Sequence, residues 1–146
     1  MAILKLADRL YVSPQLTRED VAEAAAMGIG SVICNRPDGE EEGQPSFAQL
    51  QQWLNEAGIR ESRHQPVTAP AINGNDVAEF QNLLALSAKP VLAFCRTGTR
   101  SSLLWAFGQV RQGRDAAEVI AAAKAAGVDL SNFAQRLQNA AKGGLG

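Results

Sequence analysis

The chain has 146 residues, 46% of them apolar and 20% charged, which is enough to bury one hydrophobic core and predicts a single domain over residues 1–146. A net charge of −1 with scattered basic residues argues against nucleic-acid binding. The sequence has neither the apolar core of a signal peptide nor a run of about 20 apolar residues able to span a membrane, so we expect a cytoplasmic protein. Its two cysteines are then expected to be reduced thiols.

Strand and helix patterns alternate through the first two thirds of the chain. Thr17 follows a strand and is a typical helix cap, and Gly28 is a typical helix stop. Ser46 caps the next helix after a polar loop over 36–45 that is rich in turn residues. In chain order we expect strands over 9–13, 30–35, within 59–67 and over 91–94, and helices over 17–28, 46–57, 76–86 and from 101 to 107.

This alternation predicts an α/β fold with a mainly parallel central sheet flanked by helices. The last third of the chain is Ala-rich and is expected to form helices over 115–126 and 132–141 that pack on the sheet. Ligands of parallel sheets bind at the carboxyl ends of the strands. Cys95 follows one predicted strand and Asn35 and Arg36 follow another, so this edge is the expected site.

The segment from Cys95 to Ser101 carries the clearest chemical motif. It reads Cys-Arg-Thr-Gly-Thr-Arg-Ser and forms a turn between an apolar strand and an apolar helix. Backbone N–H groups that converge at a helix N-terminus, together with the Arg100 guanidinium, favour an anion, and we expect Cys95 to react there as a thiolate. The predicted catalytic residues are Cys95 and Arg100, and the predicted substrate-binding residues of the loop are Arg96, Thr97, Gly98, Thr99 and Ser101.

Other polar residues allow two interpretations each. Arg36 and Asp38 either bind substrate beside the cysteine loop or pair with each other in a surface turn. The acidic run 40–42 is most simply a solvated face. Cys34 is expected to be buried in the sheet rather than to act as a second thiol. One histidine, His64, cannot build a histidine-rich metal site, and we expect no metal and no organic cofactor.

Three segments together resemble the phosphatase-like domain of the beta-lactamase-hydrolase-like proteins. They are 11–16 (Tyr-Val-Ser-Pro-Gln-Leu), 33–40 (Ile-Cys-Asn-Arg-Pro-Asp-Gly-Glu) and 95–101, and the likeness covers about residues 8–110. The resemblance implies a fold like that of the dual-specificity phosphatases, whose loop binds a phosphoryl group. Some members are joined to a persulfide-oxidising metallohydrolase, which the resemblance implies as a partner. Members carry both phosphatase and sulfurtransferase labels.

Three differences from the phosphatase pattern favour sulfur transfer. Phe94 stands where those phosphatases have His, and four residues separate Cys95 from Arg100, the loop length of rhodanese sulfurtransferases. The stretch 66–73, where the pattern has an Asp general acid, contains no carboxylate. We therefore expect a sulfurtransferase in which Cys95 accepts the outer sulfur of thiosulfate or a persulfide and passes it to a thiol acceptor.

Two alternatives stay open. The first is a phosphatase acting on phosphate esters through the same Cys95 and Arg100, with Asp38 or Asp76 as the acid. Asp76 is also expected in the first turn of its helix, where acidic residues are favoured. The second alternative is a non-catalytic module that senses an anion or a persulfide.

Overall fold

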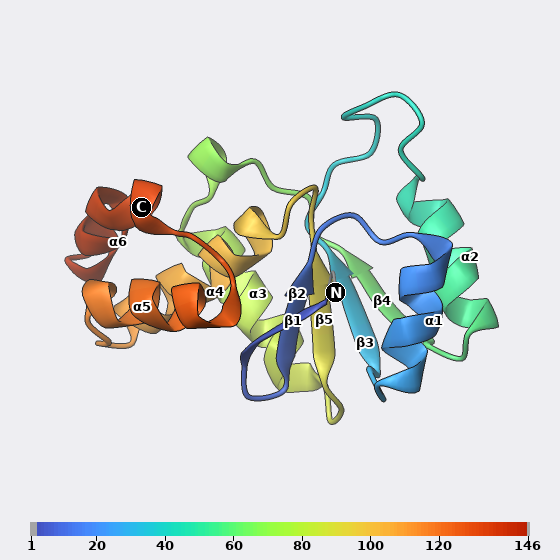
Figure 1. The fold of residues 1–146 in the computed structure, drawn as a ribbon. Coiled ribbons are helices and arrows are strands. Elements are labelled where there is room, and N and C mark those ends of the chain that lie inside the picture. The colour runs from blue at the N-terminus through green and yellow to red at the C-terminus, as the bar shows by residue number, and fades with distance from the viewer. Residues whose placement is uncertain (1–2, 146) are drawn as a thin grey trace.

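A mixed sheet of five strands forms the centre of the computed structural model, which describes residues 3–145, and its strand order is β1-β2-β5-β3-β4 (Figure 1). Strands β2, β5, β3 and β4 are parallel, and β1 is antiparallel to β2. The prediction of a mainly parallel sheet is confirmed, while β1 was not predicted. The strands are β1 (Leu4–Ala7), β2 (Leu10–Ser13), β3 (Ser31–Cys34), β4 (Glu61–His64) and β5 (Val91–Phe94).

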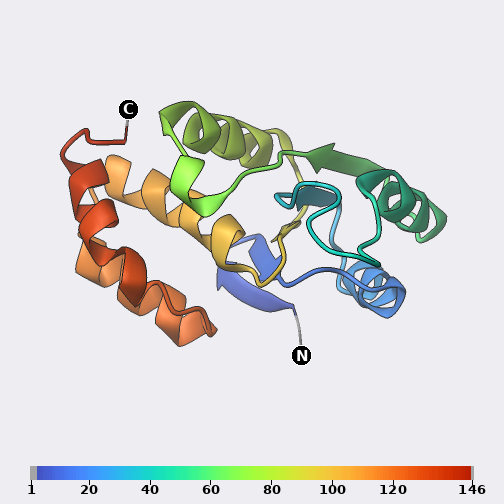
Figure 2. The same ribbon diagram turned by 90° about the horizontal axis from the view of Figure 1, so that it is seen from above.

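Helices cover both faces of the sheet. One face carries α1 and α2, and the other carries α3 and α4, with α5 and α6 packed on the far side of α4 (Figures 1 and 2). The predicted helical C-terminal third is confirmed, but its expected packing on the sheet is confirmed only in part: α5 contacts α4 and strand β1, whereas α6 packs on α4 and α5. The helices are α1 (Arg18–Ala26), α2 (Phe47–Glu56), α3 (Gly74–Leu86), α4 (Thr99–Arg111), α5 (Ala116–Ala126) and α6 (Ala134–Ala141), with 3-10 turns at Ala69–Ala71 and Ser131–Phe133.

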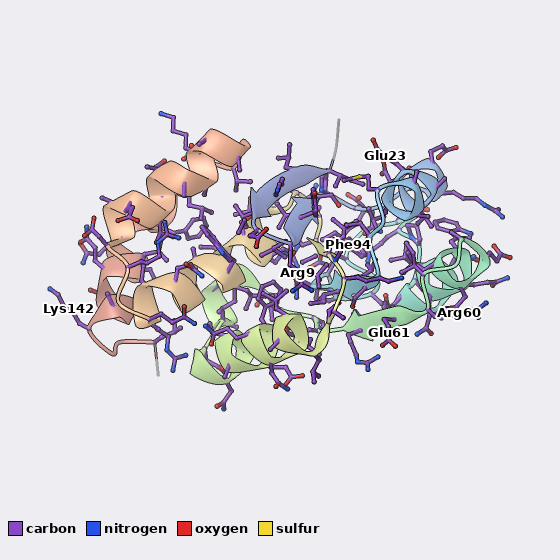
Figure 3. All side chains as sticks on the ribbon, turned by 90° about the horizontal axis from the view of Figure 1, so that it is seen from below. Arg9, Glu23, Arg60, Glu61, Phe94 and Lys142 are labelled. Carbon is purple, nitrogen blue, oxygen red and sulfur yellow. The ribbon has the colours of Figure 1, made fainter. Side chains whose placement is uncertain are left out.

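Strand β5 shows why the fold has two cores. Val91 and Ala93 point into the core under α3 and α4, whereas Leu92 and Phe94 point into the core under α1 and α2. Successive strand residues face opposite sides of a sheet, so a strand covered on both faces is apolar throughout. Figure 3 shows Phe94 in the middle of the molecule; it has no exposed surface, and burial of such a ring contributes roughly 1.5–3 kcal/mol.

Capping side chains set the starts of three helices. Thr17 and Asp20 form a reciprocal capping box at α1, and Asn73 and Asp76 form another at α3. Ser46 accepts a hydrogen bond from the backbone N–H of the third residue of α2, as expected of a cap. No helix within residues 3–145 is long and apolar enough to cross a membrane.

Helix α4 begins two residues earlier than expected. Its N-cap is Gly98, whose φ of 90° lies in the left-handed region that glycine adopts readily. The turn after β5 is therefore shorter than predicted, and Arg100 belongs to the first turn of α4. Nine residues of α4 are buried, because the helix lies between the sheet and the other helices of its layer.

Candidate active site

The carboxyl ends of three parallel strands meet at one edge of the sheet. Ser13 and Cys34 both lie opposite Phe94 in the strand register. The N–H of Asn35 extends this pairing by donating to the Phe94 carbonyl at 2.8 Å. The cysteine loop after β5 and the 36–45 loop after β3 both rise from this edge (Figure 1). The topology thus brings together the two segments that the sequence analysis singled out.

The cysteine loop wraps its backbone around the Cys95 sulfur. The Gly98 N–H donates to Cys95 Sγ at an N···S distance of 3.0 Å, directly at the N-terminus of α4. The Cys95 N–H donates to the Ser13 carbonyl at 3.4 Å, and the Gln15 N–H donates to the Arg96 carbonyl at 3.2 Å. Cys95 has no exposed surface. The predicted position of Cys95 beside a helix N-terminus is confirmed, and its role as a nucleophile stays a prediction.

Hydroxyl groups hold the loop in this shape. Ser101 Oγ donates to Asn35 Oδ1 at 2.7 Å, which ties the start of α4 to the end of β3. Thr97 Oγ1 donates to Thr99 Oγ1 at 3.2 Å on the outer side of the loop. Asn35 is fully buried, and its amide also donates to the Gln65 carbonyl at 3.0 Å. Substrate binding by Ser101 stays a prediction, because its hydroxyl is engaged with Asn35 in this structure.

One end of the Arg100 guanidinium is hydrogen-bonded, and the other end has no hydrogen-bond partner among the described residues. Its Nη1 and Nη2 atoms each donate to one carboxylate oxygen of Glu40 at 2.9 Å, and Nη1 also donates to the Val67 carbonyl at 3.0 Å. The edge formed by Nε and the second Nη2 hydrogen has no hydrogen-bond partner among the described residues. A guanidinium edge of this kind binds two oxygens of one anion in parallel.

The acidic run 40–42 is exposed as expected, but Glu40 and Glu41 also form ion pairs that the sequence did not predict. Glu40 also accepts from Arg36 Nε at 3.0 Å, and its side chain is 24% exposed. Glu41 pairs with Arg36 at 3.4 Å and with Arg96 at 3.6 Å. The Arg100 hydrogen bonds hold the pKa of Glu40 below its ordinary value, and Glu40 in turn raises the pKa of Arg100. The carboxylates neutralise the arginines around the cysteine loop.

Arg36 and Asp38 occupy structural positions in the 36–45 loop. Arg36 is 1% exposed and donates to Gln15 Oε1 at 2.9 Å as well as to the glutamates, so it joins the loops after β2 and β3. The expected Arg36–Asp38 pair does not form; instead Asp38 Oδ1 accepts from the Phe47 N–H at 2.8 Å, at the start of α2. Direct contact of either residue with a substrate stays a prediction.

Asp76 and Cys34 are the other predicted candidates near this edge. Asp76 accepts from the Asn73 N–H at 3.0 Å in the α3 capping box, as its expected first-turn position requires. Cys34 is 4% exposed and its thiol donates to the Arg36 carbonyl at 3.4 Å, which confirms its expected burial in the sheet. Burial raises the pKa of Cys34 to about 12. At neutral pH this thiol is therefore protonated and a poor nucleophile.

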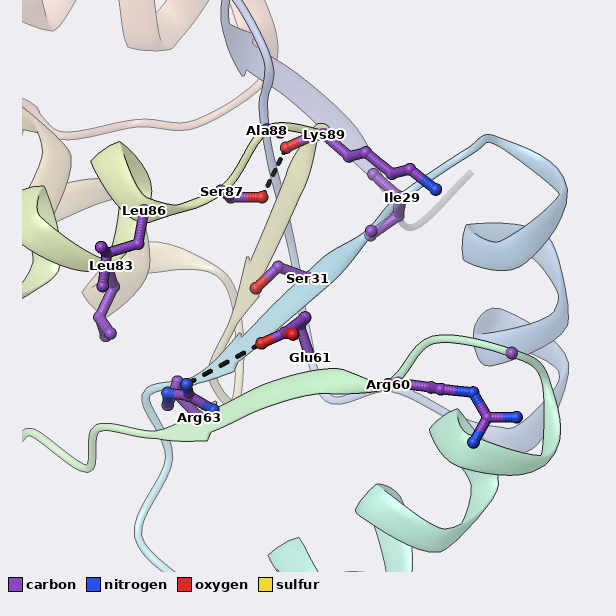
Figure 4. A pocket seen from close by; sticks show the side chains of 12 residues that line it. Ile29, Ser31, Arg60, Glu61, Arg63, Leu83, Leu86, Ser87, Ala88 and Lys89 are labelled. Atoms are coloured by element: carbon purple, nitrogen blue, oxygen red, sulfur yellow. Dashed lines mark hydrogen bonds and ion pairs between the residues drawn. The ribbon is translucent and has the colours of Figure 1, made fainter.

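A hollow of about 450 Å³ lies at the opposite edge of the sheet (Figure 4). Its wall includes Ser31 and Glu61, which begin β3 and β4, and Leu86 at the end of α3. None of the predicted site residues lines it. The candidate chemistry therefore lies at the cysteine loop and not in this hollow.

Comparisons with known proteins identify the family and the fold of this chain. The family described as beta-lactamase hydrolase-like protein, phosphatase-like domain, matches residues 3–112. A beta-lactamase hydrolase-like protein of Agrobacterium fabrum is 35% identical over 114 residues, which cover 78% of this chain and 26% of the relative. The chain thus spans about a quarter of that relative's length.

Two solved structures show the same fold. A proposed phosphatase of Neisseria meningitidis Z2491 is 55% identical and superposes with a TM-score of 0.93, covering 96% of this chain and 99% of that one. A kinase-associated phosphatase superposes with a TM-score of 0.75 at 15% identity, covering 98% of this chain and 94% of that one. At this low identity the second likeness concerns the fold alone. The predicted phosphatase-like fold is confirmed.

Proposed function

The chain belongs to the phosphatase-like domain family of the beta-lactamase hydrolase-like proteins, and from this premise we propose that it is a cysteine-dependent phosphatase. This proposal puts the phosphatase alternative ahead of the sulfurtransferase that the sequence analysis preferred. One observation carries it: the Gly98 N–H donates to Cys95 Sγ, while Arg100, in the first turn of the same helix, leaves its Nε–Nη2 edge without a hydrogen-bond partner among the described residues. The sulfur of Cys95 and the Arg100 guanidinium, here called the anion clamp, thus lie on the two sides of the α4 N-terminus.

In the proposed reaction the Cys95 thiolate attacks the phosphorus of a phosphate monoester. The sulfur–phosphorus bond forms as the bond from phosphorus to the leaving oxygen breaks, and the leaving group takes the electron pair. Charge on the phosphoryl oxygens is stabilised by the open edge of Arg100 and by the loop N–H groups at the positive end of α4. Water then attacks phosphorus, releasing inorganic phosphate and restoring the thiolate.

Sulfur transfer is the second candidate, because four residues separate Cys95 from Arg100. A shorter loop makes a narrower ring of donors, which suits the single outer sulfur of a persulfide. In that reaction Cys95 takes a sulfur atom from thiosulfate, releases sulfite, and passes the sulfur to a thiol acceptor. A sensor that binds an anion without turnover is the third candidate.

Mass spectrometry of the intermediate tests these candidates. Wild-type protein and Cys95→Ser are each given para-nitrophenyl phosphate or thiosulfate and quenched in acid. The phosphatase proposal expects release of nitrophenol and an adduct with the mass of one phosphoryl group on wild type only. A one-sulfur adduct without nitrophenol release refutes it in favour of sulfur transfer, and no adduct with either donor favours the sensor.

The partner protein and the cellular location of this chain are further proposals. The relatives carry about two thirds or more of their length outside the matched region, so a metallohydrolase partner remains a proposal for this chain. Location in the cytoplasm likewise stays a prediction.

A further inference from the structure

We propose that the site acts on phosphoryl groups whose leaving group departs as a stable anion, such as acyl phosphates and aryl phosphates of acidic phenols, and turns over alkyl phosphates poorly. This inference rests on the proposed phosphatase function. It follows from where the carboxylates around the cysteine loop are placed. Four of the five have hydrogen-bond or ion-pair partners whose contacts conflict with giving a proton to a leaving oxygen, and the fifth, Glu42, is exposed to solvent.

An alkoxide leaving group needs a proton as it departs. Positioned general acids contribute about 100- to 10,000-fold to such steps. A carboxylate or an acidic phenolate leaves as an anion and needs no proton. The protonation state of the nearby acidic side chains therefore decides which phosphate compounds the site can cleave.

Glu40 is the carboxylate nearest to the anion clamp, and it is ionised. Both of its oxygens accept from Arg100 at 2.9 Å, and one also accepts from Arg36 at 3.0 Å. A proton on Glu40 would break at least one of these charge-assisted bonds. The pair therefore makes Glu40 a positioning residue for Arg100 and a poor proton donor.

Three other acidic groups of this edge have hydrogen-bond or ion-pair partners, and a fourth has none among the described residues. Asp38 accepts from the Phe47 N–H at 2.8 Å, and Asp76 accepts from the Asn73 N–H at 3.0 Å. Glu41 bridges two arginines, and Glu42 is exposed and has no hydrogen bond or ion pair with any described residue.

His64 is the one histidine of the chain, and an imidazole can donate a proton. It lies on β4, with β3 between it and the cysteine strand. Its Nε2 atom lies 2.9 Å from the Arg36 carbonyl oxygen, and its ring stacks on Phe47 with centroids 4.8 Å apart. These contacts hold the imidazole within the base of the 36–45 loop.

A pair of aryl phosphates tests the inference. The phenol released from para-nitrophenyl phosphate has a pKa of about 7, and the phenol released from phenyl phosphate has a pKa of about 10. Without a general acid, we expect kcat/KM of wild-type protein to favour the nitrophenyl ester by about 30-fold or more. A smaller preference overturns the inference. Acetyl phosphate should likewise be hydrolysed much faster than phosphoserine, and comparable rates for these two overturn it as well.

Single variants test whether any of these side chains acts as a general acid. The preference for the nitrophenyl ester is a ratio measured within one protein, so partial misfolding does not change it. We expect the ratio to stay within about threefold of wild type in every variant, and a rise beyond this names the altered residue as the acid and overturns the inference. The variants are Asp38→Asn, Glu40→Gln, Glu41→Gln, Glu42→Gln, His64→Gln and Asp76→Asn.

The outcomes separate this inference from the function on which it rests. Good turnover of phenyl phosphate leaves the phosphatase proposal standing and removes only the restriction to stable leaving groups. Absence of turnover with para-nitrophenyl phosphate and acetyl phosphate removes both.

Discussion

Replacing Glu40 by Gln should destabilise the fold and loosen the anion clamp. The change keeps the size of the side chain but removes the charge that Arg100 and Arg36 share. Exposed ion pairs are worth below about 1 kcal/mol, and breaking a buried pair costs about 3–5 kcal/mol. The Glu40 and Arg100 side chains are 24% and 15% exposed, between these limits. We therefore expect Glu40→Gln to lower the free energy of unfolding by about 1–2 kcal/mol at pH 7.

The loss should depend on pH in a defined direction. Arg100 holds the pKa of Glu40 below its ordinary value of 4.5, so the stabilisation is present above that pH and is lost as the pH falls through the lower pKa of the folded protein. Glu40→Gln has no group to titrate at this position. Wild type and variant should therefore converge in stability as the pH drops below about 4.5.

Urea unfolding at pH 7 and at several values below 4.5 measures this difference. Glu42→Gln is the matched control, because the same chemical change at an exposed residue without a partner should shift stability by less than about 0.5 kcal/mol. Equal effects of the two variants at pH 7 would show that the Glu40–Arg100 pair does not stabilise the fold. A difference that grows in acid would refute the assigned pKa direction.

Three further changes test the reaction itself. Cys95→Ser should reduce turnover of para-nitrophenyl phosphate to background, because a neutral hydroxyl is a far weaker nucleophile than a thiolate. Enzymes that lose their nucleophile typically keep no more than about a few per cent of their activity, so a higher remaining activity contradicts the mechanism. Arg100→Lys should lower kcat/KM by roughly 10-fold or more, since an ammonium group offers no planar edge, and near-normal rates would mean that Arg100 acts as a point charge. Cys34, with a pKa raised to about 12 by burial, should resist iodoacetamide in the folded protein at pH 7 and react only after unfolding, which peptide mapping can follow.

Much of the site could be predicted from local sequence. A cysteine directly after an apolar strand, with a glycine three residues later and an apolar helix following, determines the loop and its place at the sheet edge. Burial of Cys34 and the capping role of Asp76 also follow from short-range patterns, and both are confirmed. In each case the interacting groups are close in sequence or belong to one element.

The roles of Glu40 and Asn35 could not be predicted in this way. Glu40 meets Arg100 across 60 residues and Ser101 meets Asn35 across 66, so these contacts exist only once β3 and β5 are neighbours in the sheet. An acidic run reads as a solvated face when its partners are unknown. Strand β1 was missed for a related reason, because its four residues form a strand only by pairing with β2.

The ion pairs around the cysteine loop connect the binding of the substrate with the choice of leaving group. To fix the Arg100 guanidinium with its Nε–Nη2 edge open, Glu40 must be ionised and accept two hydrogen bonds. To protonate a leaving oxygen, the same side chain would have to carry a proton and face the substrate. One carboxylate cannot do both in a single turnover step, and its two short bonds to Arg100 favour the first. A site that uses its nearest acid to orient its anion clamp is therefore suited to substrates that bring their own stable leaving group.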